Sequence, residues 1–272
     1  MIPAPFTYRR AGTVEEALDL AADAGDDGKY MAGGQSLLPL MKLRFAVPEV
    51  LIDIGRLTEL SYVRDEGSHI AIGALTRHHD VEHSGLLAAE LPLLAHAAGC
   101  VGDPQVRHRG TIGGSLAHGD AASDLPAVVL ALDATLVVRG PSGSREIAAA
   151  EFFSGLFETA LDPGELLTEI RIPKPAQRGW SFQKFTKRAI DWAIVGVAVQ
   201  GGHVGLVNMG SVPMRAAGVE RALAAGAGPA DAAAHAADGT SPASDLGASA
   251  AGQHPGEVLP VGRALAEAAS RN

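Results

Sequence analysis

Apolar and polar residues in the first part of the chain follow a helical period and then a strand-like pattern. Apolar side chains recur with helical spacing from Val14 to Ala21, and Thr13 with Glu16 can form a capping box at the start of this helix. The next apolar runs are short and bounded by glycine or proline, which is typical of strands. They predict strands over residues 29–32 and 50–54, with a loop over 33–36 and a helical turn over 37–42 between them. Together these elements form a small βαβ-like unit.

The middle of the chain contains further strand and helix patterns around a long polar segment. They predict strands over 69–74, 134–138 and 166–172, helices over 92–99 and 127–132, and a helix after Thr76 as its N-cap. Glycine and proline at 140–143 indicate a hairpin. The segment GDPQVRHRGTIGGSLAHGDAASDLP, residues 102–126, predicts a loop. Pro173 and Pro175 end the last strand, because a proline ring cannot donate to a β-ladder.

The final third of the chain predicts a separate sheet followed by helices. Strands over 181–185, 193–199 and 203–209 form an antiparallel meander, and the alanine-rich sequence from Arg215 onward is helical, with an interruption over 239–256. We therefore expect a small N-terminal α/β lobe over 1–57, a larger α+β lobe over 58–173 and a C-terminal domain over 174–272.

Composition narrows the class of protein. A chain of 272 residues that is 47% hydrophobic can bury a real core, and a net charge of -9 disfavours nucleic acid as the main partner. A single cysteine, Cys100, cannot form an intramolecular disulfide or hold an iron–sulfur cluster, so a redox centre in this chain would be an organic cofactor. The N-terminus carries no secretory pattern and no apolar run is long enough to span a membrane, which predicts a cytoplasmic protein.

Two glycine-rich loops carry the candidate chemistry. A glycine pair lets a ligand approach the backbone, successive N–H groups can converge on an anion, and a following helix N-terminus adds partial positive charge. Hydroxyl groups beside these amides supply further donors. Each loop taken alone is better explained by an ordinary turn, but two matching loops suggest the two sides of a phosphate site. The residues concerned are Ala32, Gly33, Gly34, Gln35 and Ser36 in the first loop, and Thr111, Ile112, Gly113, Gly114 and Ser115 in the second.

Other polar residues leave alternatives open. Asp120 and Asp124 can accept hydrogen bonds from a ribose or adenine, or can belong to a solvated loop. His78, His79 and His83, with Asp80 and Glu82 nearby, resemble metal ligands only loosely, and a polar helix face explains them better. The chain has neither the G-x-G-x-x-G dinucleotide fingerprint nor a phosphate loop, and it lacks the nucleophile elbow and zinc-protease motifs.

The two loops also carry a family resemblance. AGGQSLLPLMKLR and TIGGSLAHGDAASDLP resemble the paired FAD-binding loops of the medium, flavoprotein subunit of molybdenum hydroxylases, the family of carbon monoxide dehydrogenase and xanthine dehydrogenase. KFTKRAIDWAIVGVAV and VGLVNMGSVPMRA extend the resemblance into the last third of the chain. It implies an α+β vanillyl-alcohol-oxidase or PCMH-type FAD-binding fold with a C-terminal three-stranded antiparallel sheet plus helices.

The resemblance also implies roles for individual residues. Residues 32–36, the adjoining Leu37 and residues 111–115 would contact the FAD pyrophosphate, and Asp124 would lie near the ribityl or adenosine part. Lys184 and Trp192 would lie near the isoalloxazine ring, although core packing also explains a tryptophan. Gln35 departs from the family pattern, where histidine or threonine is more usual, and the closing helix keeps only the Arg-Ala-Leu of residues 263–265.

The function implied by the resemblance is electron transfer within a complex. An iron–sulfur small subunit with two [2Fe–2S] clusters would supply electrons, and a large subunit would hold the molybdenum cofactor, in a dimer of heterotrimers. Neither a catalytic side chain nor a metal site is expected in this chain, and NAD, quinone or oxygen remain open as final acceptors. Two alternatives are a self-sufficient FAD-dependent oxidoreductase and a non-catalytic assembly subunit.

Overall fold

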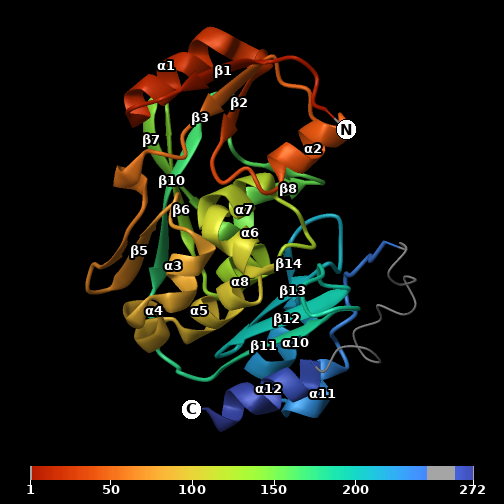
Figure 1. Cartoon of the computed structure of the whole chain (residues 1–272). Helices are drawn as coiled ribbons and strands as arrows, with labels where there is room; N and C mark the ends of the chain where they lie inside the picture. The colour runs from red at the N-terminus through yellow and green to blue at the C-terminus, as the bar shows by residue number, and fades with distance from the viewer. Residues whose placement is uncertain (1, 244–260, 272) are drawn as a thin grey trace.

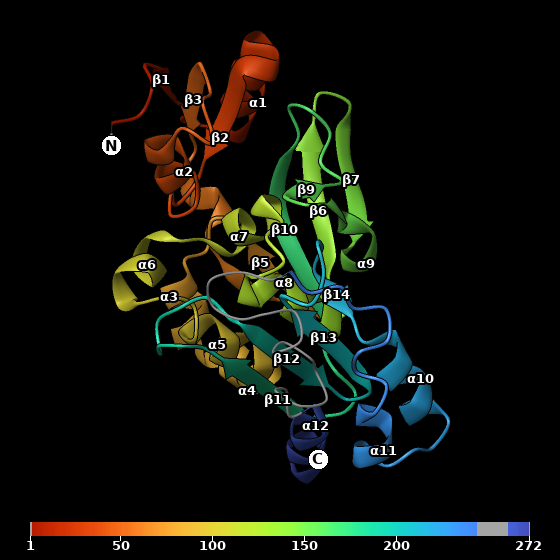
Figure 2. The same cartoon turned by 90° about the vertical axis from the view of Figure 1, so that its right-hand side faces the viewer.

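The computed structural model describes residues 2–243 and 261–271 and arranges them around three main sheets (Figure 1). The N-terminal elements lie at one end of the molecule and the C-terminal helices at the other, and the turned view keeps this order (Figure 2). The predicted mixture of helix and sheet is confirmed.

The N-terminal sheet is parallel and has the strand order β1-β3-β2. Its first strand was not expected, because all four of its residues are exposed and show no apolar pattern. Thr13 caps α1 as predicted, but the Glu16 carboxylate accepts from the N–H of Gly12 rather than from that of Thr13. The elements are β1 (Thr7–Arg10), α1 (Val14–Ala24), a 3-10 turn (Gly25–Asp27), β2 (Gly28–Met31), α2 (Leu37–Leu43) and β3 (Val50–Asp53).

The central sheet is antiparallel, with the order β4-β5-β10-β6-β7. The predicted strand over 166–172 is its middle strand and pairs with a neighbour on each edge. The strands are β4 (Val63–Asp65), β5 (His69–Gly73), β6 (Thr135–Gly140), β7 (Gly143–Ala148) and β10 (Leu166–Pro173), with a 3-10 turn (Thr58–Leu60) before them and the small hairpin β8 (Phe153–Gly155) and β9 (Glu158–Thr159) after α9 (Ala149–Phe152).

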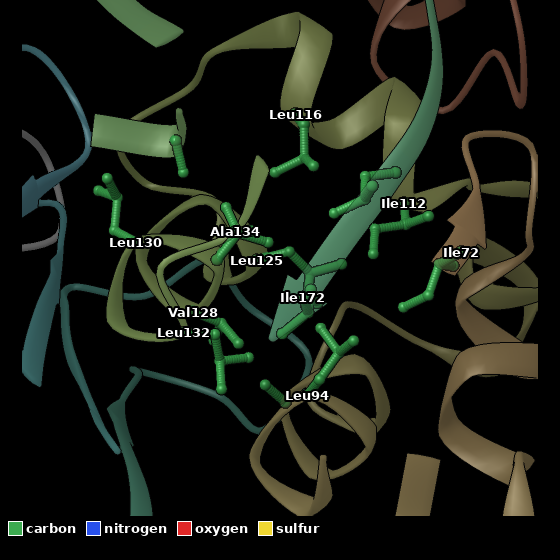
Figure 3. Close-up of a cluster of buried hydrophobic side chains, with 14 of the residues drawn as sticks. Ile72, Leu94, Ile112, Leu116, Leu125, Val128, Leu130, Leu132, Ala134 and Ile172 are labelled. Carbon is green, nitrogen blue, oxygen red and sulfur yellow. The ribbon is translucent and has the colours of Figure 1, made fainter. Parts of the chain in front are cut away.

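Helices pack against this sheet and enclose the main core. Side chains of Ile72, Leu94, Leu125 and Ile172, from two helices and two strands, point toward one another there (Figure 3). The helices are α3 (His78–His83), α4 (Gly85–Glu90), α5 (Pro92–Gly99), α6 (Pro104–Arg109), α7 (Ile112–His118) and α8 (Asp124–Ala131).

The loop predicted over residues 102–126 is wrong, because this segment contains α6, α7 and the start of α8. Asp103 accepts a hydrogen bond from the N–H of Val106 at 2.9 Å, and Thr111 accepts one from the N–H of Gly114 at 3.1 Å. Side-chain caps therefore start two short helices that a glycine-rich composition conceals. The predicted N-cap at Thr76 is also wrong: its hydroxyl bonds the backbone of Tyr62, and Arg77 takes the cap position of α3 without a side-chain bond.

The C-terminal sheet has four antiparallel strands, not the three predicted. The extra strand is the residue pair Met214–Arg215, which turns back onto Leu206 and Gly205 and is too short for an apolar pattern to reveal. The predicted interruption of the C-terminal helical segment, over 239–256, falls mostly outside the described residues. The elements are β11 (Trp180–Phe185), β12 (Val195–Gln200), β13 (His203–Val207), β14 (Met214–Arg215), α10 (Ala217–Ala224), α11 (Pro229–Ala233) and α12 (Val261–Ser270).

The C-terminal sheet is joined to the central core through α8. A Cβ added at Gly205 of β13 would lie 2.0 Å from the carbonyl oxygen of Ala127, so only glycine allows this approach. Just after α8, Asp133 forms an ion pair with Arg215 at 2.5 Å, and its other carboxylate oxygen lies 2.8 Å from Nδ1 of His203. Backbone packing and a small charge network together set the position of the sheet.

We expect Gly205→Ala to destabilise the protein by about 2–3 kcal/mol, because the new Cβ forces β13 and α8 apart. The matched control is Gly202→Ala, since no atom lies within 4 Å of a Cβ built at Gly202. Urea unfolding followed by circular dichroism measures both. Equal stability of the two variants would contradict the packing described for α8 and β13.

Candidate functional site

The two glycine-rich loops meet in space although about 80 residues separate them in the chain. A Cβ added at Gly33 would lie 2.2 Å from the carbonyl oxygen of Arg109, so the first loop packs directly against the backbone that leads into the second. A Cβ added at Gly114 would lie 3.7 Å from the Cβ of Ala32. The Arg77 guanidinium donates to the carbonyl of Arg109 and to that of Gly55, which ties the backbone before the second loop to the turn after β3.

The first loop offers a run of free backbone donors. It leaves β2, turns through Gly34 in the left-handed region at φ 74°, and enters α2. Within the described part of the chain, the N–H groups of residues 33–37 donate to no acceptor, and the Ser36 hydroxyl makes no capping bond. Gln35 is exposed, and its side-chain amide donates to the carbonyl of Gly33 at 3.3 Å. Five successive free N–H groups at a helix start attract an anion.

The second loop is different, because its backbone donors are already used. The N–H of Ile112 donates to the Thr76 carbonyl at 3.0 Å, and that of Gly113 donates to the Ala74 carbonyl at 2.8 Å. The N–H of Gly114 donates to the hydroxyl of Thr111. Gly113 is buried against Ala74, where an added Cβ would lie 2.5 Å from the Ala74 Cβ. The second loop therefore contributes shape and hydroxyl groups more than backbone donors.

Ser115 is oriented by a buried histidine. The Nε2 atom of His78 lies 3.1 Å from the Ser115 hydroxyl oxygen, and Nδ1 of His78 has no partner among the described residues. Burial, together with the charges of Arg107 and Arg77, lowers the pKa of His78 to about 4, so the ring is neutral at pH 7. If the proton of the neutral ring is on Nε2, the ring donates to Ser115, and the Ser115 O–H is free to donate to another group. The buried Nδ1 then carries only a lone pair, which costs less to leave without a partner than an N–H group would.

Asp124 and Lys184 form a buried ion pair next to the second loop. The Lys184 ammonium lies 2.7 Å from Oδ2 of Asp124 and 3.0 Å from the carbonyl oxygen of Cys100. Burial raises the pKa of Asp124 to about 6, although the Lys184 charge acts in the opposite direction. Oδ1 of Asp124 is buried without a partner in the described structure. Asp120 instead stays local, accepting from the N–H of Ala122 at 2.9 Å.

Trp192 is not a core residue. Its side chain is 57% exposed, on the loop between β11 and β12 that also exposes Ile190, and Phe185 at the end of β11 is exposed as well. The core-packing explanation of this tryptophan is therefore wrong. The structure thus brings the two loops together and pairs Asp124 with Lys184. The contributions of Ala74, Thr76 and His78 were missed, because they lie far from the glycine motifs in the chain and carry no motif of their own.

The fold and the free amides describe a candidate anion-binding site between an N-terminal parallel sheet and a central helical layer. Residues 4–175 match the family described as the FAD binding domain in molybdopterin dehydrogenase. The chain belongs to this family, which makes it an FAD-binding oxidoreductase subunit. Among the described residues, no helix is long and apolar enough to cross a membrane.

Relatives that are named for different substrates are similar to this chain in sequence. The chain is 49% identical over 200 residues to the carbon monoxide dehydrogenase medium chain of Hydrogenophaga pseudoflava, covering 73% of this chain and 70% of the relative. It is 46% identical over 199 residues to the 6-hydroxypseudooxynicotine dehydrogenase complex subunit alpha of Paenarthrobacter nicotinovorans, covering 73% and 67%.

A solved structure extends the comparison over the whole chain. The structure of carbon monoxide dehydrogenase from Hydrogenophaga pseudoflava, which lacks the Mo-pyranopterin moiety of the molybdenum cofactor, superposes with a TM-score of 0.94 at 43% identity, covering 100% of this chain and 99% of the solved one.

The titration of Asp124 provides a test of the buried pair. Because its folded pKa of about 6 lies above the ordinary value of 3.8, Asp124 stabilises the fold at low pH and loses this contribution as pH rises through 6. Relative to Asp124→Asn, we expect the wild-type unfolding free energy to fall by roughly 2 kcal/mol between about pH 4 and pH 7. Unfolding curves measured across this range check it.

The control for this titration is Asp19→Asn, which removes an exposed carboxylate on α1. Unfolding curves of this variant over the same range show the effect of removing a carboxylate that is exposed rather than buried. A difference for Asp124→Asn that is flat, or that grows with pH, would contradict a carboxyl group whose pKa is raised by burial.

Proposed function

We propose that this chain is the FAD-binding electron-transfer subunit of a molybdenum hydroxylase complex. The observation that carries the proposal is the run of N–H groups of residues 33–37, which have no partner in the described chain and lie next to the start of α7. Two phosphates need several donors and a backbone that they can approach closely, and both requirements are met by these residues.

In this proposal, the FAD pyrophosphate lies between the two loops. The amides of residues 33–37, from Gly33 to Leu37, and the Ser36 hydroxyl bind it from one side, while Ala32 lines the turn. Gly114 leaves space on the other side, and His78 orients the Ser115 hydroxyl toward the ligand. Residues 111–113 support this side through the backbone bonds of α7. We also propose a PCMH-type fold with lobes over 1–57, 58–173 and 174–272. The three separate sheets support this division.

We place the isoalloxazine end of FAD beside Lys184 and Trp192. The Lys184 ammonium is held in place by Asp124 and by the carbonyl of Cys100, so it provides a fixed positive charge at low conformational cost. The exposed Trp192 ring provides an apolar surface that a bound ring system can cover. Asp120 is assigned to the ribose or adenine side of the ligand.

The chain's own residues bind, orient and shield the cofactor. FAD held there would supply the one-electron and two-electron redox chemistry of a flavin. No side chain in the site is required as an acid or base, because substrate oxidation takes place on another subunit. The different substrates named for the relatives agree with this division of labour, since subunits with similar sequences serve different chemistry.

We further propose an iron–sulfur small subunit with two [2Fe–2S] clusters and a molybdenum-cofactor large subunit as partners, in a dimer of heterotrimers. A relative that is itself a subunit of a dehydrogenase complex supports an assembly of several chains. NAD, quinone and oxygen are the candidate acceptors.

Ser36→Ala is expected to weaken FAD binding about tenfold or more, because a hydrogen bond to a charged oxygen is lost. The variant should not change the stability of the flavin-free protein, since the Ser36 hydroxyl caps nothing in α2. Titration of flavin-free protein with FAD, followed by flavin fluorescence, measures the affinity. Gly33→Val is less informative, because its Cβ would strike the Arg109 carbonyl whether or not FAD is bound.

The control for this substitution is Ser142→Ala, which removes an exposed hydroxyl from the turn between β6 and β7. It should bind FAD like the wild type. If the Ser36 and Ser142 variants bound FAD with equal affinity, Ser36 would not contribute to FAD binding.

The function is tested by purifying the chain from its native host and analysing flavin, iron and molybdenum together. We expect all three to co-elute in one complex, and we expect the isolated flavin-loaded chain to remain oxidised when an organic substrate is added. A stable monomer that contains only flavin and is reduced directly by substrate would show a self-sufficient oxidoreductase instead.

A further inference from the structure

A second cluster of polar side chains lies on α3, outside the proposed flavin site. His79, Glu82 and His83 place one donor atom each within 4.8 Å of one another. The spacing of three and four residues puts all three on one face of the helix. Donor atoms at this separation can share a single metal ion.

The histidine rings in this cluster pack on one another. The ring centroid of His79 lies 4.2 Å from that of His83 and 4.1 Å from that of His108, which belongs to the neighbouring helix α6. Helices α3 and α6 lie side by side (Figure 2). A merely solvated helix face gives no reason for three imidazoles from two helices to gather at one point.

Hydrogen bonds prepare two of these side chains as ligands. Nδ1 of His83 lies 2.9 Å from the carbonyl oxygen of His79, which can only accept, so Nδ1 carries the proton and Nε2 keeps a lone pair. One carboxylate oxygen of Glu82 accepts from Nε of Arg107 at 2.8 Å, which fixes the carboxylate and leaves its other oxygen available. Partners of this kind orient ligands in known metal sites.

The geometry points to a site for one divalent transition-metal ion of the zinc class, bound by His79, Glu82 and His83. Two imidazoles and one carboxylate suit Zn²⁺, whereas Mg²⁺ and Ca²⁺ prefer oxygen ligands alone. The His83 side chain is 60% exposed, so an ion can enter and water can complete its coordination. His108, stacked on His79, is the nearest further imidazole.

This site is separate from the FAD chemistry. None of its three ligands contacts the loops at residues 32–36 or 111–115 through a hydrogen bond in the described structure. Zinc binding is therefore expected in the flavin-free protein and in the flavin-loaded protein alike, so the metal site and the proposed function can fail independently.

Calorimetric titration of the full chain with ZnCl₂ tests the proposal. We expect one equivalent to bind, and we expect His79→Ala with His83→Ala to weaken binding at least about 100-fold, because two direct ligands are lost. Glu82→Gln should weaken it less. The matched control is His235→Ala, which removes an exposed histidine elsewhere and should bind zinc like the wild type. MgCl₂ should give no comparable heat.

Co²⁺ provides a second readout that reports coordination directly. A wild-type complex with strong visible absorption, typical of four-coordinate Co²⁺, supports the site, and its loss in the double variant assigns the ligands. Zinc that binds equally to wild type and double variant, or that binds neither, overturns the proposal. Far-ultraviolet circular dichroism and FAD binding of each variant show that the fold is retained.

Discussion

The structure depends on a close backbone approach between the turn at Gly33 and the end of α6 at Arg109. No side chain fits between them, so the N-terminal parallel sheet and the central helices can meet only where glycine is present. The same Arg109 carbonyl accepts a hydrogen bond from Arg77, which comes from the strand-to-helix connection before α3. One contact therefore positions the two loops relative to each other, and the site exists because of it.

The two loops have similar sequences but opposite states of hydrogen bonding. Amides of the second loop are bonded to Ala74, Thr76 and Thr111, which holds α7 firmly against β5 and the segment that follows it. Amides of the first loop have no partner in the described chain, and unpaired donors at a partly buried turn are costly unless a ligand meets them. A rigid support on one side and free donors on the other suit a phosphate-bearing cofactor that must be held in a fixed position.

The buried pair of Asp124 and Lys184 links the site to the C-terminal sheet. Asp124 starts α8, Lys184 lies on β11, and the ammonium also bonds the end of α5. Moving two charges out of water costs desolvation free energy, and this cost raises the pKa of Asp124. Such a pair fixes the position of one element against another more than it adds to stability. It keeps a positive charge beside the place proposed for the flavin ring.

The sequence by itself determined the mixed fold, the helix capped at Thr13, the middle strand of the central sheet and the two loops as a candidate anion site. Local periodicity, capping residues and glycine pairs predict these features, because each of them acts over a few neighbouring residues. Local patterns missed β14 and the helices hidden in residues 102–126, because their stability comes from pairing and caps rather than from an apolar stripe. Only the tertiary structure decided which loop keeps free amides, how His78 meets Ser115, and that Asp124 pairs with Lys184. Each of these depends on contacts between distant parts of the chain, and no local pattern encodes the distance between two backbones.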